Sequence, residues 1–478
     1  MDAASFQFVL FGLVAALLSN LSRSQVWRST VLMAASIVFL YLLAHGVLVL
    51  LPLGAFLLLG YGGLFLLERG WSRSMAWILV AVIFVYIWLK KYSFLPEGVF
   101  LQFPYFTLGL SYIFFRVLHL LLDAVDKRDK TRIGPGAYLL YTLNFTTFVC
   151  GPIQRYDEFA ADQFAVEPIA LDEVVIGLQL ERIVRGFFKV NVLATVFDMV
   201  RTDSLVQLFQ PLPLPFRLFA ALRLVIVYPL FLYANFSGYI DIVIALARLM
   251  RLRLPENFDR PFAASSVLDF WGRWHMTLSN WLKRYVYNPL LLALMRRVSS
   301  MAMQPFLEIL CFFLTFFLIG VWHGRTSEFV FFGVLTGGGI SVNRLWQLGL
   351  VRLLGRRGYK ELAKEYFYVA FCRGLNFVWF AVTLFWFWAD WEHIHRIFAA
   401  LSVPLWFGVG AAAWLFATVV LALWEWLRAV LLSISVSEQP VFTSRYARAV
   451  YATAMGLAAF VMTVLLKQPA PGIVYKAF

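Results

Sequence analysis

The fold is decided by apolar stretches such as FLEILCFFLTFFLIGVW, which occupies Phe306–Trp322 and carries one charged residue, Glu308. About 20 consecutive apolar residues suffice for a helix to cross the hydrocarbon core of a bilayer. Such runs recur along the chain, and they are continuous rather than alternating, which favours helices over the strands of a membrane barrel. We therefore expect an all-α, polytopic membrane protein with about 11–13 helices, some of them short and re-entrant. The other long runs are Val31–Leu51, Ala55–Leu67, Met75–Leu89, Leu101–Leu122, Ala137–Val149, Leu218–Ala234, Phe329–Leu345, Val369–Trp388, Val403–Leu427 and Ala447–Leu466.

The composition of the whole chain agrees with a membrane protein. Of 478 residues, 62% are hydrophobic and 14% are charged, whereas a soluble domain carries about 25% charged residues. A soluble fold of this length cannot bury so much apolar surface. The composition excludes a soluble enzyme, a disordered protein and a nucleic-acid-binding protein. Because the sequence has no Gly/Ser linker and no internal repeat, we expect one membrane-embedded domain over residues 1–478.

The distribution of basic residues predicts an orientation. The net charge is +14, and basic residues of membrane proteins concentrate in cytoplasmic loops. The apolar N-terminal stretch MDAASFQFVLFGLVAALLSN, residues 1–20, is expected to be the first span. Arg23 and Arg28 follow it, and Arg69 and Arg73 follow the third span. These alternate loops therefore belong in the cytoplasm, which places the N-terminus outside. The basic stretch Arg352–Lys364 is expected to be another cytoplasmic loop, in contact with anionic lipid.

The region Asn235–Leu290 does not resemble an ordinary span, because it mixes charged and aromatic residues within a hydrophobic chain. A charge near the bilayer centre costs at least about 2.5 kcal/mol, so this region must line an interior cavity or lie at an interface. Ser265 and Ser266 are suitable N-caps for a helix DFWGRWHMTLSNWLKRY, residues Asp269–Tyr285. Asp269 and Arg273 would be one turn apart on this helix, a spacing that favours an ion pair.

The predicted helix presents large rings beside polar groups. Trp274, Leu278 and Trp281 fall on one face, and His275 and Ser279 fall on the adjacent face. Two interpretations remain open at this point. The helix lines a substrate channel, or it lies at the interface with its tryptophans among the lipid headgroups.

A second unusual position is His323, which follows the run Phe306–Trp322 directly. A histidine at the end of a span is either solvated at the interface or held inside the protein. Its neighbours Gly320 and Gly324 permit close approach of another backbone, which suits either tight helix packing or a substrate channel.

No metal site is expected. Cys150, Cys311 and Cys372 lie in or beside apolar runs, far apart in sequence, and do not have the spacing of zinc ligands. The pair His393 and His395 forms an HxH motif, but no further ligands accompany it.

Five segments, taken in chain order, are similar to the motifs of one known family. They are CGPIQRYDEF from Cys150, NFSGYID from Asn235, PENFDRPF from Pro255, DFWGRWHMTLSNWLKRYVYNP from Asp269 and GVWHG from Gly320. The chain resembles the membrane-bound O-acyltransferase family. Within it, the chain is similar to the bacterial branch that contains the alginate O-acetylation membrane subunit and the teichoic-acid D-alanylation membrane protein. The motif-bearing core covers residues 150–340 and departs from the family at Thr336, where a histidine is often found.

The resemblance implies that His275 and His323 are both needed for acyl transfer from a thioester to an alcohol. Such a reaction requires a base, donors for the developing oxyanion and exclusion of water. Histidine suits the role of base because its ordinary pKa of about 6.5 lies near neutral pH. We expect His323 to be the base, and His275 to orient a substrate, stabilise the oxyanion or act as a second proton carrier.

Further residues are assigned weaker roles on the same resemblance. The expected substrate or channel residues are Trp271, Trp274, Trp281, Trp322, Asn235, Tyr239 and Ser279. The expected supporting residues are Asp269, Arg273, Glu256, Asn257 and Arg155. Arg155, Lys283 and Arg284 either contact phosphates of the donor or are lipid-facing cations.

The resemblance also implies substrates, partners and a location. The donor is an acyl thioester, acetyl-CoA or an acyl carrier protein, acting as co-substrate, and no tightly bound cofactor is expected. The acceptor is a hydroxyl of an exported envelope polysaccharide or of a periplasmic relay partner, reached through a central funnel in the bacterial inner membrane. The expected partners are a periplasmic SGNH-hydrolase-like acetyltransferase or polysaccharide assembly proteins, a possible acyl carrier protein and membrane lipid, with no nucleic acid.

Three alternatives stay open. The first is D-alanyl transfer from a carrier protein to teichoic acid. The second is a transporter in which His275, Asp269 and Arg273 form a proton or ion relay, although no paired repeat typical of transporters is found. The third is a non-catalytic scaffold for polysaccharide assembly.

Overall fold

The computed structural model describes residues 5–44, 46–126, 132–298, 300–436, 439–440, 444–467 and 470–472. The chain divides into two compact units. Unit 1 contains Met1–Gly186, Tyr239–Glu256 and Gly472–Phe478, and unit 2 contains Phe187–Gly238 and Asn257–Pro471. The single domain expected from the sequence stays a prediction.

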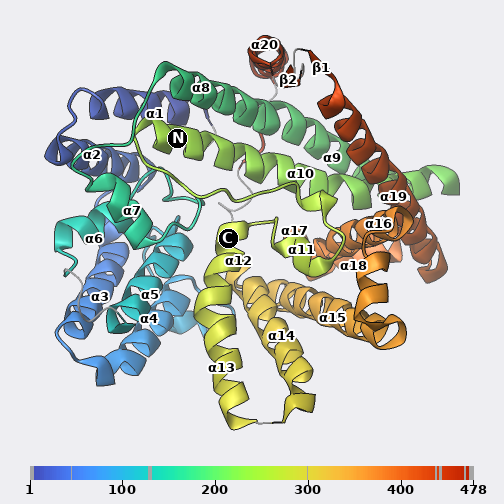
Figure 1. Ribbon diagram of the computed structural model, residues 1–478, viewed down its shortest axis with the longest axis horizontal. Coiled ribbons are helices and arrows are strands. Elements are labelled where there is room, and N and C mark those ends of the chain that lie inside the picture. The colour runs from blue at the N-terminus through green and yellow to red at the C-terminus, as the bar shows by residue number, and fades with distance from the viewer. Residues whose placement is uncertain are drawn as a thin grey trace. The chain divides into compact units, whose positions relative to one another are not determined.

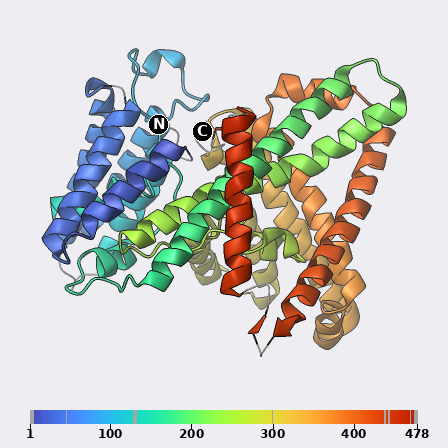
Figure 2. The same cartoon turned by 90° about the horizontal axis from the view of Figure 1, so that it is seen from above.

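Unit 1 is built from helices of the first part of the chain. They are α1 (Phe6–Ser19), α2 (Gln25–Ala44), α3 (Leu51–Glu68), α4 (Met75–Leu89), α5 (Leu110–Asp126), α6 (Pro135–Thr142), α7 (Tyr156–Gln163) and most of α8 (Glu173–Phe188). The C-terminal part of α10 (Leu214–Leu249) also belongs to unit 1. Figure 2 shows the first of these helices, coloured blue, running alongside one another.

Unit 2 contains α9, the rest of α10 and the helices that follow α10. They are α9 (Thr195–Phe209), α11 (Val267–Trp271), α12 (Met276–Leu282), α13 (Asn288–Arg297), α14 (Gln304–His323), α15 (Ser327–Leu362), α16 (Tyr366–Thr383), α17 (Phe385–Trp388), α18 (Trp391–Ala399), α19 (Val403–Ser433) and α20 (Arg445–Phe460). A two-residue antiparallel pair, β1 (Ser435–Val436) and β2 (Gln439–Pro440), follows α19.

Short 3₁₀ and π segments join several helices. The 3₁₀ segments are η1 (Leu48–Leu50), η2 (Ser72–Ser74), η3 (Glu97–Val99), η5 (Pro261–Ala263) and η7 (Met301–Met303). The π segments are η4 (Lys189–Ala194), η6 (Lys283–Tyr287) and η9 (Val461–Leu465).

The prediction of an all-α, multi-pass membrane protein is confirmed. Among the described residues, eight helices are long and apolar enough to cross a membrane. They span Gln25–Ala44, Leu48–Glu68, Ser72–Leu89, Leu214–Leu249, Met301–His323, Tyr366–Trp388, Val403–Ser433 and Arg445–Leu465. The expected set of about 11–13 helices also includes shorter ones, and among the described residues α1 is a shorter apolar helix of this kind.

Two predicted runs have the wrong boundaries. The run Leu101–Leu122 becomes helical only at Leu110, after Gly109 with φ +76°. The run Ala137–Val149 ends as a helix at Thr142. The amide of Phe145, which would continue the helix, donates to the Ser36 hydroxyl at 3.1 Å instead.

The hairpin of α14 and α15 in unit 2 positions His323. The two helices lie side by side (Figure 1) and approach closely at Gly320 and Gly333. A Cβ atom added to Gly320 would lie 2.2 Å from the Cα atom of Gly333, a distance that no real side chain tolerates. Glycine at both positions therefore permits this crossing, and His323 ends α14 less than one turn beyond it.

Candidate functional site

The segment expected to form one helix over Asp269–Tyr285 is broken in the structure. Ser266 caps α11 as expected, and its hydroxyl accepts from the Asp269 amide at 3.1 Å. However, α11 ends at Trp271 and α12 begins at Met276. Between them His275 has φ 47° and ψ 49°, in the left-handed region. The prediction of a continuous helix is wrong.

The break is explained by the segment that begins at Asn257. The amide of Met276 donates to the Asn257 carbonyl at 3.0 Å, and the amide of Asp259 donates to the Arg273 carbonyl at 2.9 Å. Phe258 and Trp274 form an isolated antiparallel bridge. Backbone groups that would continue the helix are thus bonded to another segment.

The side chain of Asn257 is fully buried and receives several hydrogen bonds. Its Oδ1 accepts from the Thr277 amide at 3.1 Å and from the Thr277 hydroxyl at 2.8 Å. Nδ1 of His275 lies 3.2 Å from the same oxygen. The imidazole of His275 is 1% exposed, and the ring of Phe236 contacts it edge-on with the centroids 5.0 Å apart.

The structure brings both predicted catalytic histidines against one indole ring. The Trp322 centroid lies 6.3 Å from the His275 centroid and 4.8 Å from the His323 centroid. The two imidazoles are therefore separated by no more than the sum of these distances. His323 is 4% exposed, and the rings of Phe387 and Phe332 lie 5.2 Å and 6.1 Å from it. His323 is a buried residue of unit 2, not a solvated helix end.

Burial decides the charge state of His275. Loss of solvent lowers its pKa to about 3, although a hydrogen bond to its own backbone opposes the shift. The imidazole is therefore neutral near pH 7, and one ring nitrogen retains a lone pair. A neutral buried imidazole is able to accept a hydrogen bond or a proton from a substrate.

The predicted channel tryptophans are buried among other rings. Trp274 lies 4.9 Å from Phe380 and is stacked on Phe270 at 5.7 Å. Trp271 contacts Phe316 at 5.4 Å, and Trp281 contacts Tyr285 at 5.0 Å. Their role as walls of a channel stays a prediction.

The remaining predicted residues of unit 2 are an ion pair and two polar residues. Arg273 and Asp269 form the expected ion pair, with Nε and Oδ1 2.8 Å apart. Asn235 is fully buried and donates to the Pro471 carbonyl at 3.4 Å. The hydroxyl of Ser279 is shielded from solvent and has no hydrogen-bond partner among the described residues, which leaves it available to a bound molecule.

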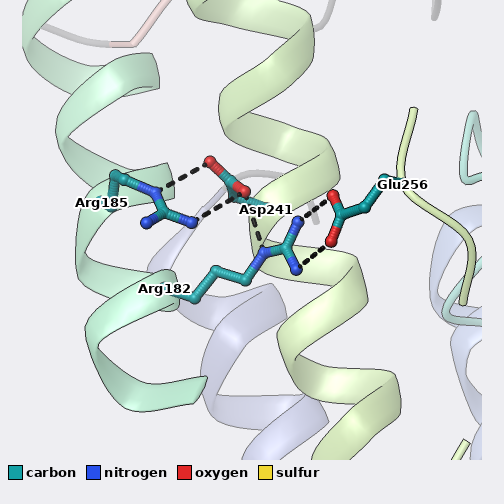
Figure 3. Close-up of polar contacts among 4 residues, drawn as sticks. All are labelled: Arg182, Arg185, Asp241 and Glu256. Carbon is teal, nitrogen blue, oxygen red and sulfur yellow. Dashed lines mark hydrogen bonds and ion pairs between the residues drawn. The ribbon is translucent and has the colours of Figure 1, made fainter. Parts of the chain in front are cut away.

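Three predicted site residues, Tyr239, Glu256 and Arg155, belong to unit 1. Tyr239 is fully buried, with its ring 6.3 Å from Phe8. Glu256 receives two hydrogen bonds from Arg182, at 2.7 Å and 2.6 Å. Arg182 also donates to the buried Asp241 at 2.9 Å (Figure 3). Glu256 thus belongs to an ion-pair group of unit 1.

Sequence reasoning missed the two arginines of this group. Arg182 and Arg185 both reach Asp241 from α8, as Figure 3 shows. Burial by itself lowers the pKa of Arg182, but its hydrogen bond with Glu256 and the charge of Asp241 outweigh burial and raise the pKa. In the sequence, Arg182 and Arg185 are about one helical turn apart in an amphipathic run, which could have indicated a shared partner. The partner carboxylates are distant in sequence, so the pattern did not identify them.

Arg155 lies beside a polar cavity of unit 1. Its guanidinium contacts Asp157 at 3.3 Å and Asp123 at 3.9 Å. Both carboxylates line a cavity of about 880 Å³. The other charged residues lining this cavity are Glu68, Arg69 and Arg132. Lys283 and Arg284, the other two candidate phosphate contacts, are exposed on η6 of unit 2.

No group of three or more His, Cys, Asp or Glu side chains able to hold a metal ion is present in the part of the chain that the structure describes. Thr336, the departure noted in the sequence, is buried on α15 and donates to the Phe332 carbonyl at 2.8 Å.

Comparison with known proteins gives a family and several relatives. The model of the membrane-bound O-acyltransferase family matches residues 70–381, a range that includes every predicted site residue. The chain is 30% identical over 241 residues to the teichoic acid D-alanyltransferase of Streptococcus thermophilus, covering 50% of this chain and 57% of that protein. It is 27% identical over 237 residues to the probable alginate O-acetylase AlgI of Pseudomonas aeruginosa, covering 50% and 42%. It is 30% identical over 220 residues to the peptidoglycan O-acetyltransferase of Helicobacter pylori, covering 44% and 37%. The chain thus matches about half the length of these relatives, or less.

Proposed function

The chain belongs to the membrane-bound O-acyltransferase family. On that premise, we propose that it transfers an acyl group from a thioester to a hydroxyl, and that this acyl group is acetyl. The proposed acceptor is an exported envelope polysaccharide or a periplasmic relay partner. Two of the relatives have names that describe O-acetylation of an envelope polymer, alginate and peptidoglycan, and these names support the acetyl group.

One observation carries this proposal. His275 and His323, from separate parts of unit 2, are both buried and both lie against Trp322. A buried imidazole costs folding free energy unless its environment compensates, and perturbed groups of this kind cluster at functional sites. Two of them beside one indole support a catalytic pair better than two unrelated packing residues.

The proposed reaction assigns the proton to His323. Its imidazole takes the hydroxyl proton as the acceptor oxygen attacks the thioester carbonyl. The new C–O bond forms, the C–S bond breaks, and the departing thiolate takes the proton back from the imidazolium. His323 is neutral before and after each turnover, and the products are an ester and a thiol.

The aromatic surroundings support such a reaction by excluding water. Phe332, Phe387 and Trp322 border His323, and water at this position would hydrolyse the thioester. Trp271, Trp274 and Trp281 lie in or beside α11 and α12. Ring contacts link Trp274 to Trp322 through Phe258, Phe236 and His275. We propose that these tryptophans border the path of the donor arm within one acyltransferase domain.

The proposed setting is the bacterial inner membrane, with the thioester arriving from the cytoplasm. The donor is acetyl-CoA or an acyl carrier protein, and the polar cavity beside Arg155 is the proposed first contact for its phosphates. The acceptor side would involve a periplasmic SGNH-hydrolase-like acetyltransferase or polysaccharide assembly proteins. A central funnel connecting the two sides stays part of the proposal.

A second candidate is D-alanyl transfer from a carrier protein to teichoic acid. The observation that favours it is the identity of 30% with the Streptococcus thermophilus D-alanyltransferase, which extends over 57% of that protein. The two candidates share the base and the thioester, and they differ in the acyl group and in the acceptor.

The test is His323→Ala in the native host, with release of acetate and D-alanine from the isolated envelope as the measurement. We expect the acyl ester content to fall about 100-fold or more, since general base catalysis contributes about 10²–10⁴-fold. The released molecule distinguishes acetylation from D-alanylation. The control is His393→Ala, because His393 is exposed on α18 and remote in sequence from both motifs.

The same experiment distinguishes an acyltransferase from a transporter or a scaffold. Membrane insertion of each variant is measured by immunoblot of the membrane fraction. If the His323→Ala protein is inserted and the ester content is unchanged, the acyltransferase proposal is wrong, and a transporter or a scaffold becomes the better reading.

A further inference from the structure

The hydrogen bonds around Asn257 determine which ring nitrogen of His275 carries the hydrogen. We propose that Asn257 is a positioning residue that holds His275 as the tautomer protonated on Nδ1, so that Nε2 accepts a hydrogen bond from the acceptor hydroxyl. The assignment of the tautomer rests on geometry alone. The statement about the hydroxyl rests on the proposed function.

The contacts with Thr277 fix the orientation of the Asn257 amide. Its side-chain atom 3.1 Å from the Thr277 backbone nitrogen must be an acceptor, because a backbone N–H donates and never accepts. That atom is therefore Oδ1, and the amide is not flipped. The Thr277 hydroxyl, 2.8 Å from the same atom, is then also a donor.

The orientation of the Asn257 amide in turn determines which nitrogen of His275 carries a hydrogen. Nδ1 of His275 lies 3.2 Å from the same Oδ1. An oxygen without hydrogens only accepts, so Nδ1 must carry a hydrogen to make this bond. In a neutral imidazole the hydrogen on Nδ1 leaves the lone pair on Nε2. The alternative tautomer would place two lone pairs against each other.

Asn257 holds both the backbone and the ring of His275 in place. His275 has a left-handed backbone with φ 47°, a conformation that costs a residue with a side chain free energy and persists only where surrounding contacts impose it. Asn257 contacts both the backbone and the side chain of this segment. Its carbonyl accepts from the Met276 amide, and its side chain bonds the His275 ring. One residue therefore fixes both the backbone turn and the ring.

The tautomer decides between the roles left open for His275. Nε2 of the neutral ring has no hydrogen to donate, so His275 does not stabilise the oxyanion as a neutral donor. Nε2 is able to accept a hydrogen bond from the acceptor hydroxyl and orient its oxygen. His275 is then the residue that presents the hydroxyl, and His323 is the residue that takes the proton.

The first measurement is ¹⁵N NMR of the full-length protein labelled with ¹⁵N-histidine, in nanodiscs at pH 7. The chain has six histidines, and His275→Asn identifies the two signals of His275. We expect a protonated-type signal for Nδ1 and a lone-pair-type signal for Nε2. The opposite assignment in the wild-type protein would overturn the proposal without any activity measurement.

The variants then test whether Asn257 is responsible. In Asn257→Asp an oxygen still accepts from Nδ1, so Nδ1 stays protonated. In Asn257→Ala the preference is lost, and both tautomers appear. Thr277→Val is the matched control, because it removes a different donor to the same Oδ1 and should leave the His275 signals unchanged. If Asn257→Ala also leaves them unchanged, Asn257 does not set the tautomer.

Kinetics separate a positioning role from a merely structural one. For Asn257→Ala we expect kcat for acyl transfer to fall about 10–100-fold, as for other residues that orient a functional histidine, with the KM for the thioester donor unchanged. Asn257→Asp should recover at least part of kcat. Equal losses in both variants, or a loss confined to KM, would contradict the positioning role. Absence of acyl transfer in the wild-type protein, with the expected NMR signals, would refute the proposed function but not the tautomer.

Discussion

At the scale of single residues, His275 combines two costs, a buried imidazole and a left-handed backbone. Removing a titratable ring from water stabilises its neutral form, and the structure accordingly lowers the pKa of His275 to about 3. An unfolded chain has no such environment, so its histidine titrates near pH 6.5. Folding stability must therefore depend on pH at this residue.

The sign of the dependence follows from the lowered pKa. The contribution of neutral His275 is fully present above pH 6.5 and is lost progressively as the pH falls towards about 3, because the unfolded state binds a proton first. We expect His275→Asn to lose less stability than the wild-type protein between pH 7 and pH 4.5, by up to about 1.4 kcal/mol per pH unit. Asparagine also tolerates the left-handed backbone.

Thermal unfolding in nanodiscs over this pH range measures the effect. The control is His395→Asn, because His395 is exposed on α18, and it should follow the wild-type profile. Parallel profiles for the wild-type protein and His275→Asn would show that His275 is not buried as the structure has it.

How far the sequence predicts the site is clear from these residues. The family motifs name His275, His323 and Asn257 as candidate site residues, and all three belong to unit 2. Asn257 contacts His275, and both histidines lie against Trp322, while their catalytic roles stay predictions. The hydrogen bonds of Asn257 were not predictable, because they depend on a backbone turn that helical spacing did not suggest. Glu256, its neighbour in sequence, was grouped with them but pairs with Arg182 of unit 1.

At the scale of elements, the α14–α15 hairpin is the support of His323. We expect Gly320→Ala to destabilise the protein by about 1–3 kcal/mol, the cost of overpacking, because its Cβ would lie 2.2 Å from the Cα atom of Gly333. The measurement is the midpoint of thermal unfolding in detergent.

Gly338→Ala on α15 is the matched control. A Cβ atom there meets nothing within 4 Å, and alanine is the better helix former by about 1 kcal/mol. We expect Gly338→Ala to be neutral or stabilising. Similar losses in the two variants would mean that helix packing at Gly320 is not the cause.

The elements also show where hydrophobic patterns fail. Long uniform runs, such as the one ending at Trp322, were predicted well, because a single apolar helix satisfies its own backbone. The segment Asp269–Tyr285 was predicted as one helix, yet the strand-like segment at Phe258 bonds its backbone and divides it. Contacts between segments distant in sequence override local spacing, and a pattern within one segment does not contain them.

At the scale of the whole molecule, the distribution of basic residues predicts the orientation in the membrane. The basic loops place Arg23 inside and the N-terminus outside, so α2 must carry the chain back to the outer side. Val47, which follows α2 and is 67% exposed, should then face outward. The exposed basic stretch at Arg356 should face the cytoplasm.

Single cysteines at these positions test the orientation. In a Cys372→Ser background, a membrane-impermeant maleimide added to intact cells stripped of their outer membrane should label Val47→Cys but not Arg23→Cys or Arg356→Cys. Inverted vesicles should give the reverse. Cys150 and Cys311 are buried and should contribute little background. The reversed pattern would place the N-terminus inside.

The rings around His323 have a consequence for bioenergetics. Three aromatic side chains border this imidazole, and hydrocarbon edges do not conduct hydrogen ions to bulk water. In the proposed reaction the ion taken from the alcohol leaves with the departing sulfur, so each turnover would move no net charge between compartments. Catalysis of this kind would be indifferent to the membrane potential, and a protonophore added to sealed vesicles would not slow it.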